Sequence, residues 1–182
     1  MRLDEAALDA YTDQFEHDAF RHEVLDHYDV PSDGGDFARW LAGEPDPSPD
    51  VIGPWAQWVR AQRQRGASVR RLRVLTESPS EYLRFEAAWA YRANVAAGED
   101  IRVLDLTEQA RPLGLDLREF WLLDGQRAAV MTYDDAGRFL YADTIEGRAG
   151  RVIRRSADIA WAAAEPFEAW WARHPEYHRA RV

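Results

Sequence analysis

The 182-residue chain contains no cysteine and no lysine, and all 23 of its basic residues are arginine. The absence of cysteine excludes disulfide bonds, thiolate nucleophiles, zinc ribbons and iron–sulfur clusters. The absence of lysine excludes a Walker phosphate loop, a pyridoxal Schiff base and a protein kinase in their usual forms, because each needs a lysine amine. No apolar run reaches about 18 residues and no leader is recognisable, so we expect a cytoplasmic protein without a membrane partner.

The acidic charge is concentrated in residues 1–50. They contain 14 acidic residues and three arginines, a balance of −11, whereas the rest of the chain balances at +2. Six arginines lie within residues 60–73, a density typical of nucleic-acid-binding surfaces. Because the whole chain carries a net charge of −9, we expect these arginines to pair with the acidic N-terminal segment, and direct nucleic-acid binding is disfavoured.

Hydrophobic patterns predict an α/β (α+β) fold with a mixed sheet packed by helices. Strand patterns at residues 68–77 and 99–106 flank a helical pattern, which indicates a parallel strand–helix–strand unit. Residues 119–145 read as three antiparallel strands that turn at Asp124-Gly125 and at residues 134–137. A long helix over residues 148–171, interrupted at Pro166, is expected to cover the sheet.

The N-terminal part is predicted to be helical. Apolar residues from Leu8 to Ala19 recur at steps of three and four, which predicts one helix over residues 3–20. The stretch "EPDPSPD" reads as a stiff linker because it holds three prolines in seven residues. The chain is therefore divided into an acidic helical segment, residues 1–50, and an α/β domain, residues 51–182, which together make one structural domain.

The candidate ligand site lies where the first parallel strand leads into its helix. Ser78, Pro79 and Glu81 fit a capping box, so Ser78 is expected to cap the helix rather than to act as a nucleophile. Spare N–H groups at such a helix end can hold a small anion. The candidate ligand-binding residues, on this end and on the neighbouring strands, are Arg71, Arg73, Thr76, Glu77, Tyr82, Arg84, Glu99, Asp100 and Trp121.

No catalytic or metal-binding constellation can be argued from spacing. We find no Ser-His-Asp set, glycine-rich nucleotide loop or paired catalytic carboxylates. His174 and His178 have a metal-binding spacing, but Pro175 lies between them near the chain end. We interpret this stretch as a frayed polar tail, and neither a metal nor a cofactor is expected. Aromatic residues such as Trp121 and Tyr133 are core candidates, or they line a pocket against the helix at 148–171.

Several stretches together resemble a known family. They include "FARWLAGEP", "SEYLRFEAAWAYRANVAAGEDIRVL", "FWLLDGQRAAVMTYDDAGRFL" and "WAAAEPFEAW", and the block "NVAAGEDIRVL" is the most specific. They are similar to an uncharacterised family of actinobacterial domains of unknown function, numbered 6879. The resemblance covers nearly the whole chain. It implies gene neighbourhoods that often contain helix-turn-helix regulators, and it supplies no established activity.

A second, shorter pattern is similar to one half of a phospholipase D-like domain. It consists of the parallel unit followed by a strand that ends in Asp124-Gly125 and turns into a hairpin. Those enzymes carry His-x-Lys-x4-Asp on this strand, and here Leu117 and Glu119 occupy the His and Lys positions. The resemblance therefore implies an architecture without phosphohistidine chemistry.

Three functions follow as hypotheses. The first is a non-catalytic binding or regulatory domain that acts with a protein partner or a small anionic ligand, linked to a helix-turn-helix regulator. The second is a small, cofactor-independent enzyme of specialised metabolism that has an aromatic and carboxylate-lined pocket. The third is a toxin or antitoxin component.

Overall fold

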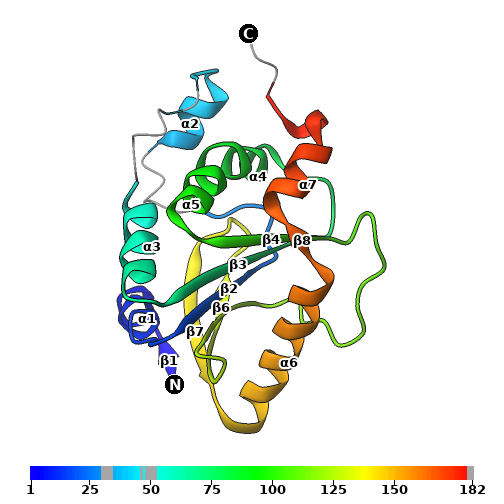
Figure 1. The fold of residues 1–182 in the computed structure, drawn as a ribbon. Helices are drawn as coiled ribbons and strands as arrows, with labels where there is room; N and C mark the ends of the chain where they lie inside the picture. Colours follow the sequence, from blue (N-terminus) through cyan, green and yellow to red (C-terminus); the bar gives the residue numbers. More distant parts are fainter. Residues whose placement is uncertain (30–34, 46, 48–52, 180–182) are drawn as a thin grey trace.

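In the computed structural model, which describes residues 1–29, 35–45, 47 and 53–179, helices cover both faces of one eight-stranded mixed sheet (Figure 1). The strand order is β1-β7-β6-β5-β2-β3-β4-β8. The strands are β1 (Arg2–Leu3), β2 (Asp18–Glu23), β3 (Ser68–Leu75), β4 (Asp100–Asp105), β5 (Glu119–Leu123), β6 (Arg127–Tyr133), β7 (Phe139–Ile145) and β8 (Glu165–Pro166).

The helices fall into an N-terminal, a crossover and a C-terminal group. They are α1 (Glu5–Thr12), α2 (Asp36–Leu41), α3 (Pro54–Gln64), α4 (Glu81–Phe85), the π-helical segment η2 (Glu86–Tyr91), α5 (Arg92–Ala97), α6 (Gly147–Ala163), α7 (Phe167–Arg173) and the 3-10 turn η3 (Pro175–Tyr177). None of the helices in the described ranges has the length and apolarity that a membrane crossing requires.

The predicted sheet units are confirmed. β3 and β4 run parallel, with Arg70 opposite Asp100 and Leu75 opposite Asp105, and α4, η2 and α5 make the crossover between them. β5, β6 and β7 form the predicted antiparallel meander. Pro166 interrupts the C-terminal helix as expected, because β8 separates α6 from α7.

The prediction of one helix over residues 3–20 is wrong beyond Thr12. The chain turns after α1 and enters β2, which lies between β5 and β3 in the middle of the sheet. Phe15 and Ala19 are buried, but they pack with Val59 of α3 rather than along a helix face. The acidic N-terminal segment thus supplies a central strand. The linker-like stretch "EPDPSPD" lies mostly outside the described residues.

The Asp124-Gly125 turn between β5 and β6 holds the start of β2 in place. The Asp124 carboxylate accepts backbone N–H groups of Glu16, His17 and Asp18 at 2.7–3.2 Å. Asp124 has a φ of 52° and Gly125 a φ of 65°, a left-handed geometry that Asp and Gly tolerate in tight hairpins. Burial raises the pKa of the Asp124 carboxyl, but the three backbone hydrogen bonds outweigh this effect and lower it.

Replacing Asp124 with alanine is expected to lower the free energy of unfolding by about 1–2 kcal/mol, the usual cost of losing a side-chain cap on free backbone N–H groups. Asp124→Asn keeps one acceptor oxygen and should lose less. Urea denaturation followed by fluorescence measures both variants. Equal stability of Asp124→Ala and the wild type would show that the turn does not hold the start of β2.

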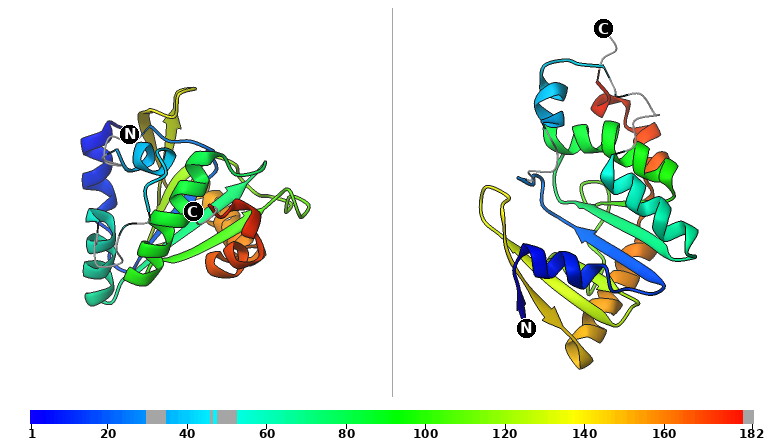
Figure 2. Two further views of the ribbon diagram at one scale, coloured as in Figure 1. Left: turned by 90° about the horizontal axis from the view of Figure 1, so that it is seen from above. Right: turned by 90° about the vertical axis from the view of Figure 1, so that its left-hand side faces the viewer.

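The two faces of the sheet bury different side chains. The face under α6, which we call the α6 face, is largely apolar, and its Phe20, Leu72 and Phe120 pack with Ile153 of α6. Seen from above, α1 and α3 lie on the other side of the sheet from α6 (Figure 2, left). Among the described residues Trp121 and Tyr133 pack on this opposite face, with apolar residues of α1, α3 and α4. Trp121 and Tyr133 therefore do not face α6, but Tyr133 belongs to the cluster of Phe167, Trp170 and Trp171 at the end of the predicted C-terminal helix.

Candidate functional site

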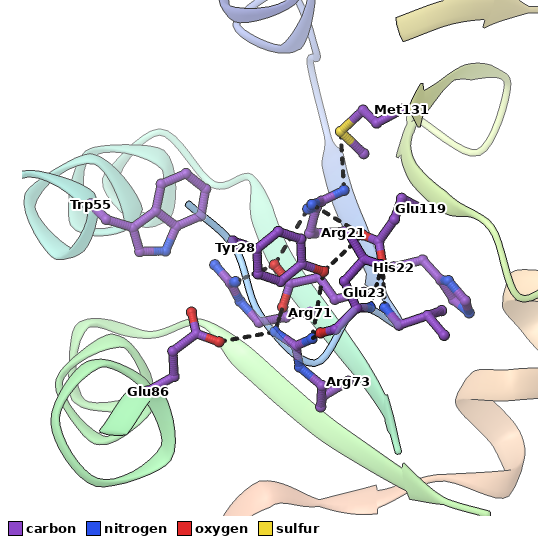
Figure 3. Close-up of polar contacts among 12 residues, drawn as sticks. Arg21, His22, Glu23, Tyr28, Trp55, Arg71, Arg73, Glu86, Glu119 and Met131 are labelled. Atoms are coloured by element: carbon purple, nitrogen blue, oxygen red, sulfur yellow. Dashed lines mark hydrogen bonds and ion pairs between the residues drawn. The ribbon is translucent and has the colours of Figure 1, made fainter. Parts of the chain in front are cut away.

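Seven charged side chains meet in the middle of the sheet face opposite α6, and Figure 3 labels all of them except Glu99. Alternate residues of a strand share a face, so Arg21 and Glu23 project from β2 in the same direction as Arg71 and Arg73 from β3. We call the set the arginine–glutamate network. Its members are Arg21, Glu23, Arg71, Arg73, Glu86, Glu99 and Glu119.

Glu23 is the centre of the network. One of its carboxylate oxygens lies 2.6 Å from Arg71 Nη1 and the other 2.7 Å from Arg73 Nη2. Arg21 Nε lies 3.4 Å away, and the Tyr91 hydroxyl donates to the same carboxylate at 3.2 Å. Register explains the arrangement: Arg21 pairs with Arg71 across β2 and β3, so the two guanidinium groups need a carboxylate between them.

Glu119 holds the loop after β2. Its carboxylate accepts the backbone N–H groups of Val24 and Leu25 at 2.5 and 2.8 Å and the Tyr28 hydroxyl at 2.9 Å. It also pairs with Arg21 Nη2 at 3.2 Å. Glu119 therefore joins β5, β2 and the following loop through one buried carboxylate.

The two β3 arginines reach the crossover helix. Arg71 Nε donates to Glu99 at 2.8 Å, and the second oxygen of Glu99 accepts the Trp55 indole N–H at 2.8 Å. Arg73 donates to the Tyr91 hydroxyl at 2.9 Å and pairs with Glu86 at 3.0 Å. Glu86 and Tyr91 are the two ends of the π-helical segment, so this irregular turn places both side chains over the sheet.

Burial and the neighbouring arginines fix the protonation states of Glu23 and of the two tyrosines that contact the network. Arg73 is 2% exposed and Glu23 is 4% exposed. Burial by itself would raise the pKa of the Glu23 carboxyl, but Arg71, Arg73 and Arg21 outweigh it and lower that pKa to about 2. Burial raises the pKa of the Tyr28 and Tyr91 hydroxyls well above the usual value. These groups therefore keep their protonation state across the neutral range, and they exchange no proton readily near pH 7.

The structure separates the sequence-predicted site residues into groups. Arg71, Arg73 and Glu99 belong to the network, and the Trp121 ring lies 5.6 Å from the Arg21 guanidinium. Arg71 and Arg73 do not lie on an exposed strand face, because α3 and the crossover helix cover that face. The expected pairing of the arginine-rich stretch with the acidic N-terminal segment is confirmed by the contacts to Glu23 and by Arg70 to Asp18.

The other predicted residues lie apart from the network. Thr76 and Glu77 are exposed beyond the carboxyl end of β3, whereas Asp100 is exposed at the opposite end of β4. Tyr82 is buried among aromatic side chains and meets Phe37 edge to face at 5.3 Å. These four residues therefore do not form one site with Arg71 and Arg73.

The helix start after β3 is capped two residues later than predicted. Ser80, not Ser78, is the N-cap, and its hydroxyl accepts the Leu83 N–H at 3.2 Å. The Ser80 N–H donates to the Asp26 carboxylate at 3.2 Å, and the hydroxyl donates to the Asp26 carbonyl at 2.8 Å. The loop after β2 decides the cap, because only Ser80 reaches it. A carboxylate of the chain itself already occupies this helix end.

Arg84 lines a surface groove between α2, α4 and the C-terminal turn. The groove encloses about 150 Å³. The Arg84 guanidinium stacks 5.3 Å from the Tyr177 ring, and Arg179 lies 4.7 Å from the Trp40 ring. Its lining is basic and aromatic, with one acidic residue: Trp40, Leu41, Glu81, Arg84, Tyr177, His178 and Arg179.

The C-terminal histidines differ from the prediction. His174 is 7% exposed and packs against Trp170, so the interpretation of this stretch as a frayed polar tail is wrong for His174. His178 lies against Trp171 and does not approach His174 as a second ligand. Within the described ranges, a set of possible metal ligands instead consists of His174, Asp105 and Glu108, whose ligand atoms lie within 4.8 Å of one another.

A comparison with family models identifies the family of the chain. The model described as a domain of unknown function, DUF6879, matches residues 6–172. The chain belongs to this family. No curated protein matches it at a significant level. The matched part of the DUF6879 domain contains the whole arginine–glutamate network and Arg84, and it ends before His174 and the C-terminal wall of the groove.

Sequence reasoning missed four of the seven network residues in this DUF6879 domain. Arg21, Glu23, Glu86 and Glu119 are not among the candidate ligand-binding residues, because the sequence alone does not show which strands lie next to one another. Two stretches carried a usable signal. In "FRHEV" an arginine and a glutamate lie two residues apart, and in "RRLRV" two arginines have the same spacing. Alternate charged residues on two neighbouring strands must face each other if the strands pair.

Proposed function

We propose that this DUF6879 domain is a non-catalytic binding or regulatory domain that holds a protein partner or a small anionic ligand in the groove beside Arg84. The main support for this proposal is the lining of the groove, which combines two arginines, a histidine and aromatic rings with a single glutamate. Planar guanidinium groups bind carboxylates and phosphates with two hydrogen bonds at once. The ligand that fits has an acidic group next to an apolar or aromatic one.

The state of the other charged groups supports a non-catalytic role. A general acid or base needs a pKa near the working pH and access to its substrate. In the network Glu23 keeps a pKa of about 2, and the carboxylates of Glu23 and Glu119 are buried and shared between donors. Such a network instead ties together the strands and the crossover helix on which the groove is built.

Replacing Arg84 with alanine tests the groove. We expect the affinity for an acidic ligand to fall about tenfold to a hundredfold, the usual worth of a hydrogen bond to a charged group. The measurement is isothermal titration with the ligand selected from a panel of phosphate, citrate, nucleotides and acidic peptides that contain an aromatic residue. Arg151→Ala on α6 is the matched control, because Arg151 is exposed and lies far from the groove in the fold.

Two results would contradict the groove as the binding site. One is an unchanged affinity in Arg84→Ala, and the other is an equal loss in Arg151→Ala, which would indicate a general effect of charge. For a protein partner, affinity capture from the native host with wild type and Arg84→Ala in parallel gives the same comparison. The partner should be depleted by Arg84→Ala and retained by Arg151→Ala.

The proposal also covers the cellular compartment of the domain and its protein partner. We place the domain in the cytoplasm of an actinobacterium, beside a helix-turn-helix regulator that carries the DNA contact. The resemblance to actinobacterial domains with such gene neighbours supports this assignment, as does the chain's net charge of −9. The relationship of the sheet to phospholipase D-like domains stays a prediction.

A further inference from the structure

A buried histidine and two carboxylates meet where β4 ends beside the last turn of α7. Asp105 is the last residue of β4, Glu108 lies three residues further on, and His174 follows α7 directly. Their possible ligand atoms all lie within 4.8 Å of one another. This cluster is separate from both the arginine–glutamate network and the groove beside Arg84.

The fold holds the Asp105 carboxylate rigidly. One oxygen accepts the backbone N–H and the hydroxyl of Thr107 at 2.9 and 2.6 Å. The other accepts the indole N–H of Trp170 at 3.0 Å. Each carboxylate oxygen has two acceptor sites, so Asp105 keeps capacity for a further partner.

His174 points an unpaired nitrogen into the cluster. Its Nδ1 lies 2.8 Å from the Glu176 carboxylate. Its Nε2 is buried and has no hydrogen-bond partner, although it lies 3.3 Å from a Glu108 oxygen. An Nδ1–H donated to Glu176 leaves a lone pair on Nε2, facing carboxylate oxygens that repel it. A cation between them would remove this repulsion.

We propose that Asp105, Glu108 and His174 bind a divalent first-row transition metal ion, with Zn²⁺ as the best-fitting representative. The imidazole ligand favours these ions over Mg²⁺ and Ca²⁺, which prefer oxygen ligands alone. Glu176 is the positioning residue, because a carboxylate on the far ring nitrogen fixes the tautomer of a metal-binding histidine. Three protein ligands leave a coordination position for water or for an anionic group.

Binding of the metal ion requires Glu108 to loosen its ion pair with Arg173. It pairs with Glu108 and also with Glu165, and its side chain is 45% exposed. One oxygen of Glu108 must therefore leave Arg173 Nη1, now 3.0 Å away, to reach the ion. Arg173 can keep its contact to the other oxygen and to Glu165. The competing occupant is a proton on Nε2, which would make His174 an imidazolium paired with Glu108.

The test is an isothermal calorimetric titration of the EDTA-stripped full chain with ZnCl₂, and a parallel titration uses MgCl₂. We expect one Zn²⁺ ion per chain and no comparable Mg²⁺ binding. His174→Ala and Glu108→Gln should lose the saturable Zn²⁺ signal, and Glu176→Gln should weaken it about tenfold. His178→Ala is the matched control, since His178 lies outside the cluster, and it should bind like the wild type.

A second readout separates metal binding from misfolding. CoCl₂ should give a visible absorption band in the wild type that disappears in Glu108→Gln, whose substitution at a partly exposed side chain leaves the core unchanged. Circular dichroism checks that both variants are folded. The inference is overturned if the wild type shows no one-to-one Zn²⁺ binding, or if His174→Ala and Glu108→Gln bind as the wild type does.

Discussion

Replacing Glu23 with glutamine is expected to lower the free energy of unfolding by about 3–5 kcal/mol, the usual cost of removing one partner from a buried ion pair. The substitution keeps the shape of the side chain and removes its charge. Three guanidinium groups then lose the carboxylate that separates them, while burial prevents water from replacing it. Urea denaturation at pH 7 measures the change. A loss of about 3–5 kcal/mol is a large fraction of the unfolding free energy of an ordinary domain.

The control for Glu23→Gln is an exposed ion pair of the same chemistry. Arg2 and Asp143 lie 3.1 Å apart, with side chains 61% and 47% exposed. Asp143→Asn should leave the free energy of unfolding nearly unchanged, because solvent screens an exposed pair. If Glu23→Gln unfolds at the same urea concentration as Asp143→Asn, the network is not a main source of stability.

His22 is expected to make the domain lose about 3 kcal/mol of stability between pH 6.5 and pH 4. The side chain is fully buried on the α6 face, stacked on Phe120, with Nδ1 2.9 Å from the Arg118 carbonyl. Burial lowers the pKa of the imidazole from its usual 6.5 to about 4. The unfolded chain therefore binds a proton in this range that the folded chain does not bind, so stability falls as the pH falls.

The variant His22→Phe isolates this effect. It should be less stable than the wild type at pH 7.5, because the Arg118 carbonyl loses its donor, and its stability should depend less on pH between 6.5 and 4.5. His17→Gln, at an exposed position, should keep the pH dependence of the wild type. The Glu23 carboxyl does not interfere, since its lowered pKa costs stability only as the pH falls below about 4.5. A pH profile of His22→Phe parallel to that of the wild type would exclude His22 as the cause.

Local chemistry explains the parts of the fold that were predicted correctly. The two strands around the crossover helix and the Asp124-Gly125 hairpin depend on periodicity and turn residues within about 30 residues of chain. The helix start at residue 81 shows the limit of such reasoning. Ser78 and Ser80 both offer a hydroxyl, and the contact with Asp26, far away in sequence, selects Ser80.

The candidate sites needed contacts that no local pattern contains. His174 lies in a polar, proline-containing tail, but Trp170 and the end of β4 bury it beside Asp105. The Arg84 groove likewise needs α2 and the C-terminal turn to meet over α4. Arg84 lies one turn inside a helix, whereas its aromatic and basic neighbours Trp40, Tyr177 and Arg179 come from distant parts of the chain.

By itself the sequence determined which chemistry is missing, because its composition lacks cysteine thiols and lysine amines. It also determined the mixed sheet, because the strand and helix patterns depend on short-range periodicity. Only the tertiary structure decided that residues 18–23 form a central strand, that Arg73 is buried and that Arg71 is largely covered. The physical reason is that a buried charge is tolerated only beside its partner. The partner of these arginines, Glu23, lies about 50 residues earlier and reaches them only once β2 and β3 pair.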